Sequence, residues 1–300
     1  MVVFPKSREE VSAILAYANE HRIPVIPFGM GTSLEGHVIP VRGGISLDLS
    51  MMNEILEIRP QDFLVRVQPG VTRQQLNQRL KTTGLYFPID PGADASLGGM
   101  AATNASGTST VRYGMMRNQV LGMEVVLADG SIIRTGGMTF KSSSGYDLRG
   151  LFIGSEGTLG VITELTLKLY AVPEKIIAAR AVFADVETAG TVAFDMMRSG
   201  LSVGRLELVD KRTIEAVNRY KNTRFPENHT LFLEFSGSAN AVQSDVELAK
   251  DIAAEYGCLS FDFEKDETAR AKLWEARHQA AMAIAAAAPQ KRLMITDVCV

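Results

Sequence analysis

PFGMGTSLEG, residues 27–36, is a glycine-rich loop that directly follows the apolar run IPVI, residues 23–26. Such a loop after a strand is typical of phosphate binding. It does not match the dinucleotide fingerprint, because Leu34 stands where a third glycine is required. It does not match the mononucleotide P-loop either, because no Gly-Lys-Ser/Thr follows. The loop therefore indicates a phosphate ligand that is held in some other way.

Two further segments rich in glycine and other small residues lie in the same half of the chain, at residues 91–107 and 154–160. Each adjoins the end of an expected strand or helix. Runs of backbone amides, together with helix N-termini, can hold a diphosphate without a charged clamp. A tight turn explains any one of these segments, but three of them are better explained by one large ligand with a central diphosphate.

The composition is that of an ordinary globular protein, and 46% hydrophobic residues in a chain of 300 are enough for two domains. The net charge of -3 gives no reason to expect a nucleic-acid partner, since nucleic-acid binders usually carry a basic excess. The two cysteines, Cys258 and Cys299, form no zinc motif and suggest no disulfide framework. We therefore expect a reducing compartment and a cytoplasmic protein, with peripheral attachment to a membrane left open.

The first half is expected to mix helices and strands. The capping-box pattern Ser7-Arg8-Glu9-Glu10 predicts an amphipathic helix over residues 8–21, and a second capping box at Thr72–Gln75 begins another helix that Gly84 ends. The turn Ala128-Asp129-Gly130 predicts a hairpin. From residue 87 to residue 107 regular periodicity disappears. The expected strands are residues 45–49, 55–59, 63–67, 124–127, 131–134 and 162–169.

The second half begins after a junction at Pro173-Glu174, which predicts domains over residues 1–173 and 174–300. Its strands and helices follow a β-α-β-β-α-β order, which is typical of a ferredoxin-like unit. A long helix over residues 267–287 and a strand over residues 293–300 come last. Because that strand stops without a turn or a polar tail, we expect the chain to be a piece of a longer one. The ferredoxin-like elements are expected at residues 176–183, 186–198, 205–208, 231–235, 242–256 and 259–263, with a short extra helix before the third strand.

The sequence resembles the flavoproteins of the vanillyl-alcohol-oxidase and p-cresol-methylhydroxylase type, and within them the cytochrome-linked D-lactate dehydrogenase group. The resemblance implies an α+β fold, with an FAD-binding domain of two α+β subdomains and a partial ferredoxin-like cap domain. It covers nearly the whole chain. The matching pieces are PFGMGTSLEG, ISLDLSMMNEILEI, VQPGVTRQQLN, DPGADASLGGMAATNASGTSTVRYG, LGMEVVLADG, GYDLRGLFIGSEGTLGVIT, LWEARH and TDVCV.

The resemblance also implies which residues bind FAD. The residues around the diphosphate are Gly29, Met30, Gly31, Thr32 and Ser33, with Gly36 nearby. Those that line the flavin and the diphosphate are Pro91, Gly92, Ala93, Ser96, Gly98, Gly99, Ala102, Thr103 and Gly107. Those on the adenosine side are Glu156, Gly157, Gly160 and Ile162. The family usually has a smaller residue than Met30, whose side chain would be tolerated if it points away from the ligand.

Relatives that bind FAD covalently through this loop carry a histidine at the position of Thr32, so the resemblance implies noncovalent FAD here. His37 lies nearby, but we expect it to face solvent. Arg277, in LWEARH, matches the position that binds the substrate carboxylate in relatives, and arginine suits that task because its planar fork pairs with both oxygens. From the residues alone, a surface arginine paired with Glu275 or another neighbour is an alternative.

His278 follows Arg277, but neighbours on a helix point about 100° apart, so we expect a packed or solvated side chain rather than a second substrate contact. The four histidines form no metal-spaced pair. Relatives carry a His-x-Gly-Asp-Gly-Asn segment farther along, which supplies a divalent metal site and a catalytic base. The resemblance therefore implies that this chain holds no metal ligands, and that its catalytic residues lie beyond Val300 in the full-length protein.

Together these features predict FAD-dependent oxidation of D-lactate or a related D-2-hydroxy acid to the 2-oxo acid. Electrons would pass to a cytochrome, a quinone or an electron-transfer flavoprotein rather than to a nicotinamide. One alternative is the flavin subunit of glycolate oxidase, and another is a noncatalytic flavin-binding subunit. The sequence leaves the oligomeric state open, a homo-oligomer included.

Overall fold

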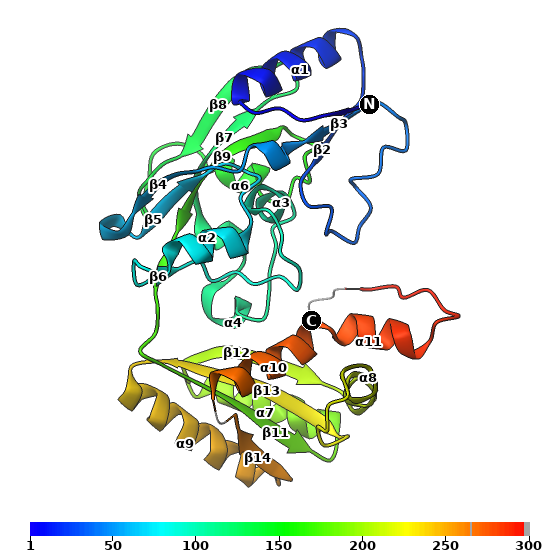
Figure 1. Cartoon of the computed structure of the whole chain (residues 1–300). Coiled ribbons are helices and arrows are strands. Elements are labelled where there is room, and N and C mark those ends of the chain that lie inside the picture. Colours follow the sequence, from blue (N-terminus) through cyan, green and yellow to red (C-terminus); the bar gives the residue numbers. More distant parts are fainter. Residues whose placement is uncertain (265, 297–300) are drawn as a thin grey trace. The chain divides into compact units, whose positions relative to one another are not determined.

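The computed structural model describes residues 1–264 and 266–296 of the chain. They divide into two compact units, Met1–Val172 and Pro173–Val300. The chain is coloured from blue at its beginning to red at its end in Figure 1, so the first unit runs from blue to green. The two units are described separately below.

A small parallel sheet with the strand order β1-β3-β2 opens the first unit, built from Val2–Val3, Ile45–Asp48 and Val25–Phe28. Helix α1, Arg8–Glu20, is capped at its N-terminus by Ser7, whose hydroxyl accepts a hydrogen bond from the Glu10 amide. The predicted capping box is incomplete, because the Glu10 carboxylate accepts a hydrogen bond from the Lys6 amide and not from the Ser7 amide. The buried face of α1 packs with residues of β3, β7 and β9, which joins the small sheet to its larger neighbour.

The larger sheet of this unit is antiparallel and has the order β4-β5-β9-β7-β8. The predicted hairpin is confirmed: Val126 pairs with Ile132, and the Asp129 carboxylate accepts the Ser131 amide in the turn between them. Each predicted strand is present with ends shifted by a few residues. The strands are β4 Ile55–Arg59, β5 Leu64–Val67, β7 Val120–Val126, β8 Ile132–Gly136 and β9 Val161–Lys168.

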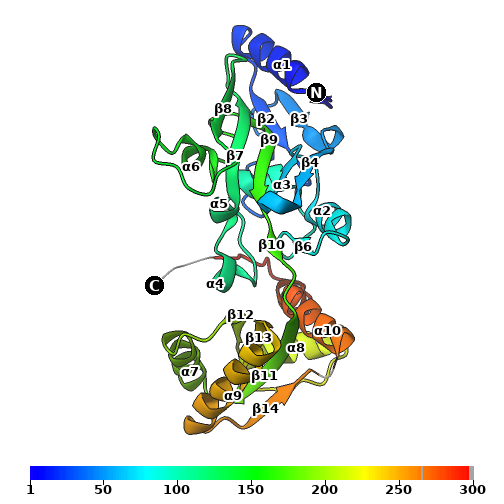
Figure 2. The ribbon, with the colours of Figure 1, turned by 90° about the vertical axis from the view of Figure 1, so that its left-hand side faces the viewer.

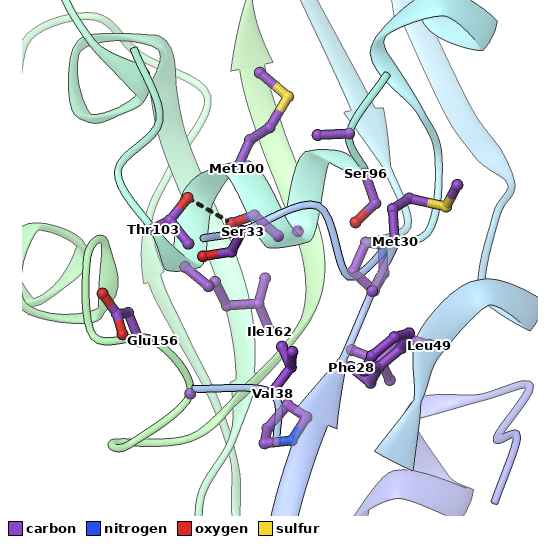
Figure 3. Close-up of a pocket in the computed structure, with 18 of the residues that line it drawn as sticks. Phe28, Met30, Ser33, Val38, Leu49, Ser96, Met100, Thr103, Glu156 and Ile162 are labelled. Carbon is purple, nitrogen blue, oxygen red and sulfur yellow. Dashed lines mark hydrogen bonds between the residues drawn. The ribbon is translucent and has the colours of Figure 1, made fainter. Parts of the chain in front are cut away.

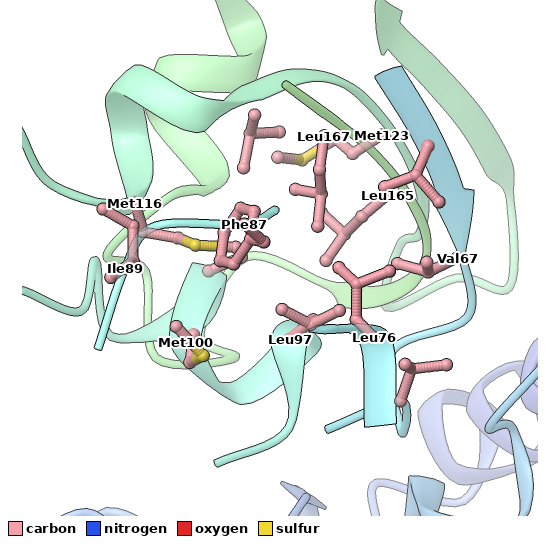
Figure 4. Packing of buried hydrophobic residues seen from close by; sticks show 14 of the residues in the cluster. Val67, Leu76, Phe87, Ile89, Leu97, Met100, Met116, Met123, Leu165 and Leu167 are labelled. Carbon is pink, nitrogen blue, oxygen red and sulfur yellow. The ribbon is translucent and has the colours of Figure 1, made fainter. Parts of the chain in front are cut away.

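Short helices and a two-stranded pair complete the unit around its main core (Figure 4). The predicted capping box of α2, Arg73–Leu80, is confirmed. The side chains of Thr72 and Gln75 each accept a hydrogen bond from the backbone amide of the other residue. Helix α3, Leu97–Ala102, lies in the stretch where the sequence has no periodicity, because six residues are too few to establish a period. The remaining elements are η1 Leu49–Met51, η2 Pro60–Asp62, β6 Leu85–Tyr86, α4 Thr110–Tyr113, α5 Met116–Gln119, α6 Leu148–Phe152 and β10 Tyr170–Ala171.

Glu124 on β7 is a buried carboxylate that ties α1 to the larger sheet. Its side chain is 3% exposed and contacts Arg8 at 2.7 Å and Arg134 at 2.9 Å. The Thr163 hydroxyl donates to its other oxygen at 3.0 Å. Since a buried carboxylate is tolerated only when its hydrogen bonds are satisfied, this cluster fixes how α1 docks on the sheet.

Replacing Glu124 by glutamine keeps the shape of the side chain and removes its charge, so two arginines lose their shared partner. We expect the free energy of unfolding of the first unit to fall by about 2 kcal/mol, and its Tm by roughly 6 °C in calorimetry. The matched control is Glu9→Gln, because Glu9 pairs with the same Arg8 but is 65% exposed. Its effect should be too small to resolve in the same scan, because an exposed ion pair is screened by solvent. Equal losses in the two variants would contradict this account of α1 docking.

The second unit contains one antiparallel sheet with the order β12-β13-β11-β14. Helices α7 and α9 cover one face of the sheet, and α8 and α10 pack on the other (Figure 2). This order confirms the predicted ferredoxin-like unit, with α8 added between its second and third strands. The elements are β11 Lys175–Phe183, α7 Val186–Arg198, β12 Val203–Val209, α8 Lys211–Lys221, β13 His229–Gly237, α9 Ala239–Glu255 and β14 Ser260–Phe263.

The prediction of one long helix over residues 267–287 is wrong. The structure has two helices, α10 Glu267–His278 and α11 Ala280–Ala287, which are separated at Gln279. The break lets the buried alanines of α11 pack against α8, which a straight continuation of α10 would not allow. Residues 293–296 form no strand, and the rest of the strand predicted there lies outside the described residues. Within the described part of the chain, no helix is both long and apolar enough to cross a membrane.

Candidate cofactor site

A pocket of about 1050 Å³, counting the space open to solvent, lies in the first unit where the three glycine-rich segments meet (Figure 3). The loop after β2 forms one wall, α3 and the residues before it form another, and the loop before β9 forms a third. The sequence prediction that the three segments serve one ligand is therefore consistent with their arrangement in space.

Glycines allow these segments to come into direct contact. A Cβ atom added at Gly29 would lie 2.5 Å from the Ser96 hydroxyl oxygen, and one added at Gly157 would lie 2.9 Å from Cγ of Pro27. Gly31 has a φ of +64°, which favours glycine, and a Cβ atom there would lie 2.7 Å from the Phe28 ring. A larger residue at Gly29 or Gly157 would push two walls of the pocket apart, and one at Gly31 would collide with the Phe28 ring of its own wall.

The first wall offers unpaired hydrogen-bond donors. In the part of the chain that the structure describes, the backbone amides of residues 30–33 have no acceptor within the protein. By contrast, the amides of Leu97 and Gly98 on the second wall donate to the carbonyls of Val71 and Pro69, so they hold the fold together and are not available to a ligand. A run of unpaired amides fits a diphosphate, and it requires no arginine or lysine.

The third wall is anchored to the end of α3. The amide of Gly154 donates to the Ala101 carbonyl at 3.0 Å, and the amide of Glu156 donates to the Ala102 carbonyl at 2.9 Å. Glu156 has a φ of +52°, which is uncommon for a residue other than glycine. This backbone conformation, held by hydrogen bonds, brings the Glu156 side chain to the pocket.

The expectation that His37 faces solvent is wrong. His37 lines the pocket with a side chain that is only 20% exposed, and its Nδ1 lies 3.2 Å from Glu156 Oε2. The Ser33 hydroxyl lies 3.5 Å from the same nitrogen. This contact could not be anticipated from the sequence, because Glu156 is more than a hundred residues away along the chain.

Most of the residues implied by the resemblance line the pocket, and four do not. Gly36 is a turn glycine with a φ of +78°, and Gly92 and Ala93 are exposed. Gly107 packs against Asp90, where a Cβ atom would lie 2.4 Å from a carboxylate oxygen, so its role is in packing. The implied residues that line the pocket are Gly29, Met30, Gly31, Thr32, Ser33, Pro91, Ser96, Gly98, Gly99, Ala102, Thr103, Glu156, Gly157, Gly160 and Ile162.

The lining residues that the sequence did not suggest are mostly apolar. Phe28 ends β2 and Leu49 directly follows β3, which is parallel to β2. Ligands commonly bind at the carboxyl ends of parallel strands, so this position was a usable signal. Val161 begins β9 on the opposite wall. The other residues in this group are Pro27, His37, Val38, Pro69, Ala95, Met100, Ala105 and Ser155.

Arg277 lies in the second unit, on α10. Its Nε and Nη2 atoms both donate to the Glu207 carboxylate on β12, at 2.8 and 2.5 Å. Glu275, the neighbour suggested by the sequence, pairs with Lys221 instead. Glu275 does not pair with Arg277, because residues two positions apart on a helix do not face each other. The Arg277 side chain is 33% exposed.

Metal and thiol chemistry receive little support in the described residues. No group of three or more His, Cys, Asp or Glu side chains there is arranged to hold a metal ion. The Cys258 thiol donates to the Ser260 carbonyl at 3.0 Å, and burial raises the pKa of this thiol above its ordinary value. A buried thiol of raised pKa is a poor nucleophile.

Comparisons with known proteins agree with this geometry. Residues 1–136 match the family described as the FAD binding domain, and residues 172–300 match the C-terminal domain of FAD linked oxidases. The fold and the pocket thus define a flavoprotein with an FAD-binding domain. The chain belongs to the FAD linked oxidases, and its pocket fits FAD because three loops line it and one of them carries a run of unpaired amides.

Similar proteins include a probable mitochondrial D-lactate dehydrogenase of Danio rerio, 47% identical over all of this chain and 61% of the relative. The mitochondrial D-lactate dehydrogenase [cytochrome] of Arabidopsis thaliana is 43% identical, over all of this chain and 53% of its own. The glycolate oxidase subunit GlcD of Bacillus subtilis is 35% identical, over 96% of this chain and 62% of its own. The chain therefore spans between half and two thirds of the length of these relatives.

Solved structures with the same fold include an alkyldihydroxyacetonephosphate synthase, with a TM-score of 0.78 and 22% identity over 93% of this chain and 54% of that one. Another is p-cresol methylhydroxylase with substrate bound, with a TM-score of 0.77 and 20% identity over 92% of this chain and 60% of that one. These similarities confirm the predicted fold class.

Proposed function

We propose that the protein oxidises D-lactate or a related D-2-hydroxy acid to the 2-oxo acid and passes the electrons to a protein or quinone acceptor. The observation that carries the proposal is the likeness, along the entire chain, to proteins named D-lactate dehydrogenase at 47% and 43% identity. The pocket lined by three glycine-rich segments, one of which carries unpaired amides, supports it, because this chemistry needs a flavin.

Different residues of the chain would bind the cofactor and the substrate. FAD, when bound, supplies the acceptor for the hydride of the substrate. The amides of residues 30–33 would hold its diphosphate. Arg277 would bind the substrate carboxylate through the part of its guanidinium that Glu207 leaves available, and Glu207 would keep that guanidinium in a fixed orientation.

A second candidate is the oxidation of glycolate, which the likeness to the glycolate oxidase subunit GlcD favours. Glycolate and D-lactate share a carboxylate and a neighbouring hydroxyl group, so Arg277 would bind both in the same way. They differ by one methyl group, which a hydrophobic pocket distinguishes by about 10- to 200-fold at most. The rates at which glycolate and D-lactate reduce the flavin therefore decide between the two candidate functions.

The test is anaerobic reduction of the flavin in the protein expressed from its complete gene. D-lactate should bleach the flavin absorbance faster than glycolate, and L-lactate should bleach it slowest. L-lactate is the matched control, since it differs from D-lactate only in handedness. Faster bleaching by glycolate would favour the second candidate. Flavin that is bound but is reduced by none of the three acids would identify a noncatalytic flavin-binding subunit and overturn the proposal.

A further inference from the structure

The loop between β2 and β3 is held to the rest of the protein by very few polar contacts. Its backbone hydrogen bonds are local: the Ile39, Val41 and Gly43 amides donate to carbonyls two or three residues earlier. Among the hydrogen bonds and ion pairs of residues 30–43 in the described chain, the pair between His37 and Glu156 is the one that reaches outside the loop.

Glu156, the partner of His37, lies in a turn that is tied to the end of α3. Its amide donates to the Ala102 carbonyl, and the Gly154 amide donates to the Ala101 carbonyl. The Glu156 backbone has a φ of +52°, which is uncommon for a residue other than glycine and persists because these hydrogen bonds hold it. The pair with His37 therefore attaches the loop to a turn that is itself anchored to α3.

The unpaired amides of residues 30–33 lie between two points of attachment. Phe28, at the end of β2, is paired with Asp48 of β3, and His37 is held by Glu156 on the opposite wall. Fixing both ends of a short segment reduces the conformations available to it before a ligand arrives. A ligand that binds a preordered loop does not have to order it, so its affinity is higher.

We propose that His37 is a positioning residue for FAD: by pairing with Glu156 it orders the amide loop and closes it on the cofactor. This inference rests on the FAD site and is independent of the substrate. Because the pair is partly exposed, its direct electrostatic contribution is small, and most of the effect comes from ordering the loop. His37 thus acts through the loop and through Glu156.

The experiment is a titration of the apoprotein with FAD, in which the dissociation constant is measured from the change in flavin fluorescence. His37→Ala should raise the dissociation constant roughly tenfold. His37→Gln should recover most of the affinity, because its amide can still donate to the Glu156 carboxylate. His21→Ala is the matched control, since His21 is exposed on the surface and its ring hydrogen-bonds to the Tyr17 carbonyl of the preceding helix.

A double-mutant cycle with Glu156→Ala separates the pair from two independent contacts. The double variant should bind FAD no more weakly than the weaker of the two single variants. Affinity of His37→Ala equal to that of the wild type, full additivity of the two losses, or failure of His37→Gln to recover would each overturn the proposal. If the wild-type protein takes up no FAD, the site itself fails; if it binds FAD but His37→Ala binds equally well, only the role of His37 fails.

Discussion

Gly31→Val is expected to weaken FAD binding by at least about a hundredfold. A residue other than glycine at a φ of +64° carries backbone strain of order 1–3 kcal/mol, and a branched side chain is among the worst cases. The added side chain would also meet the Phe28 ring and displace the unpaired amides of residues 30–33. Together these costs amount to roughly 3 kcal/mol, or more than two factors of ten in the dissociation constant.

Gly43→Val is the matched control for that prediction. Gly43 lies in the same loop with a φ of +69°, but no atom lies within 4 Å of a Cβ added there, and it does not line the pocket. It therefore carries similar backbone strain without affecting the amides of residues 30–33. Both variants are measured by FAD titration of the apoprotein. Equal weakening in the two variants would contradict the assignment of the amide run as the diphosphate site.

Arg277→Met should lower kcat/KM for D-lactate by about a thousandfold while leaving the FAD content unchanged. Losing one partner of a charged, hydrogen-bonded pair costs about 2–5 kcal/mol, and here the substrate carboxylate would lose its clamp. Arg277→Lys should recover little, because an ammonium group cannot reproduce the two donors that a guanidinium offers a carboxylate. The measurement is the steady-state rate with a dye as electron acceptor.

The control for this second prediction is Arg270→Met, which removes an arginine two turns earlier on the same helix. Arg270 pairs only loosely with Glu267, at 3.8 Å, so its loss should change kcat/KM less than about threefold. If both arginine variants lose activity equally, the helix is disturbed and Arg277 has no special role. If Arg277→Met retains full activity with D-lactate, the proposed carboxylate clamp is wrong.

Features that depend on neighbouring residues could be predicted from the sequence. The capping box at Thr72 and Gln75 and the hairpin at Asp129 each arise from a few adjacent side chains that bond to their own backbone. In the second unit, β13 could be predicted from a nearly continuous apolar run, since this strand buries residues on both of its faces. Local chemistry and hydrophobic periodicity therefore fixed most of the elements.

Features that depend on distant contacts could not be predicted in this way. The pairing of His37 with Glu156 requires two loops to meet, and the break at Gln279 depends on the packing of α11 against α8. Gly107 belongs to the same glycine-rich segment as residues that line the pocket. Its lack of a side chain, however, leaves room for Asp90 and not for a ligand. The glycine pattern identified the segments of the site, whereas the fold decides which glycines face the ligand.

The most direct test of the central claim is to measure how much FAD the purified protein carries, and whether denaturation releases it. We predict one FAD for each chain, released completely into the filtrate after acid denaturation, because the pocket holds the cofactor by backbone amides and packing. A colourless protein that takes up no added FAD would contradict the site. Flavin that stays attached to the denatured chain would contradict the noncovalent mode of binding.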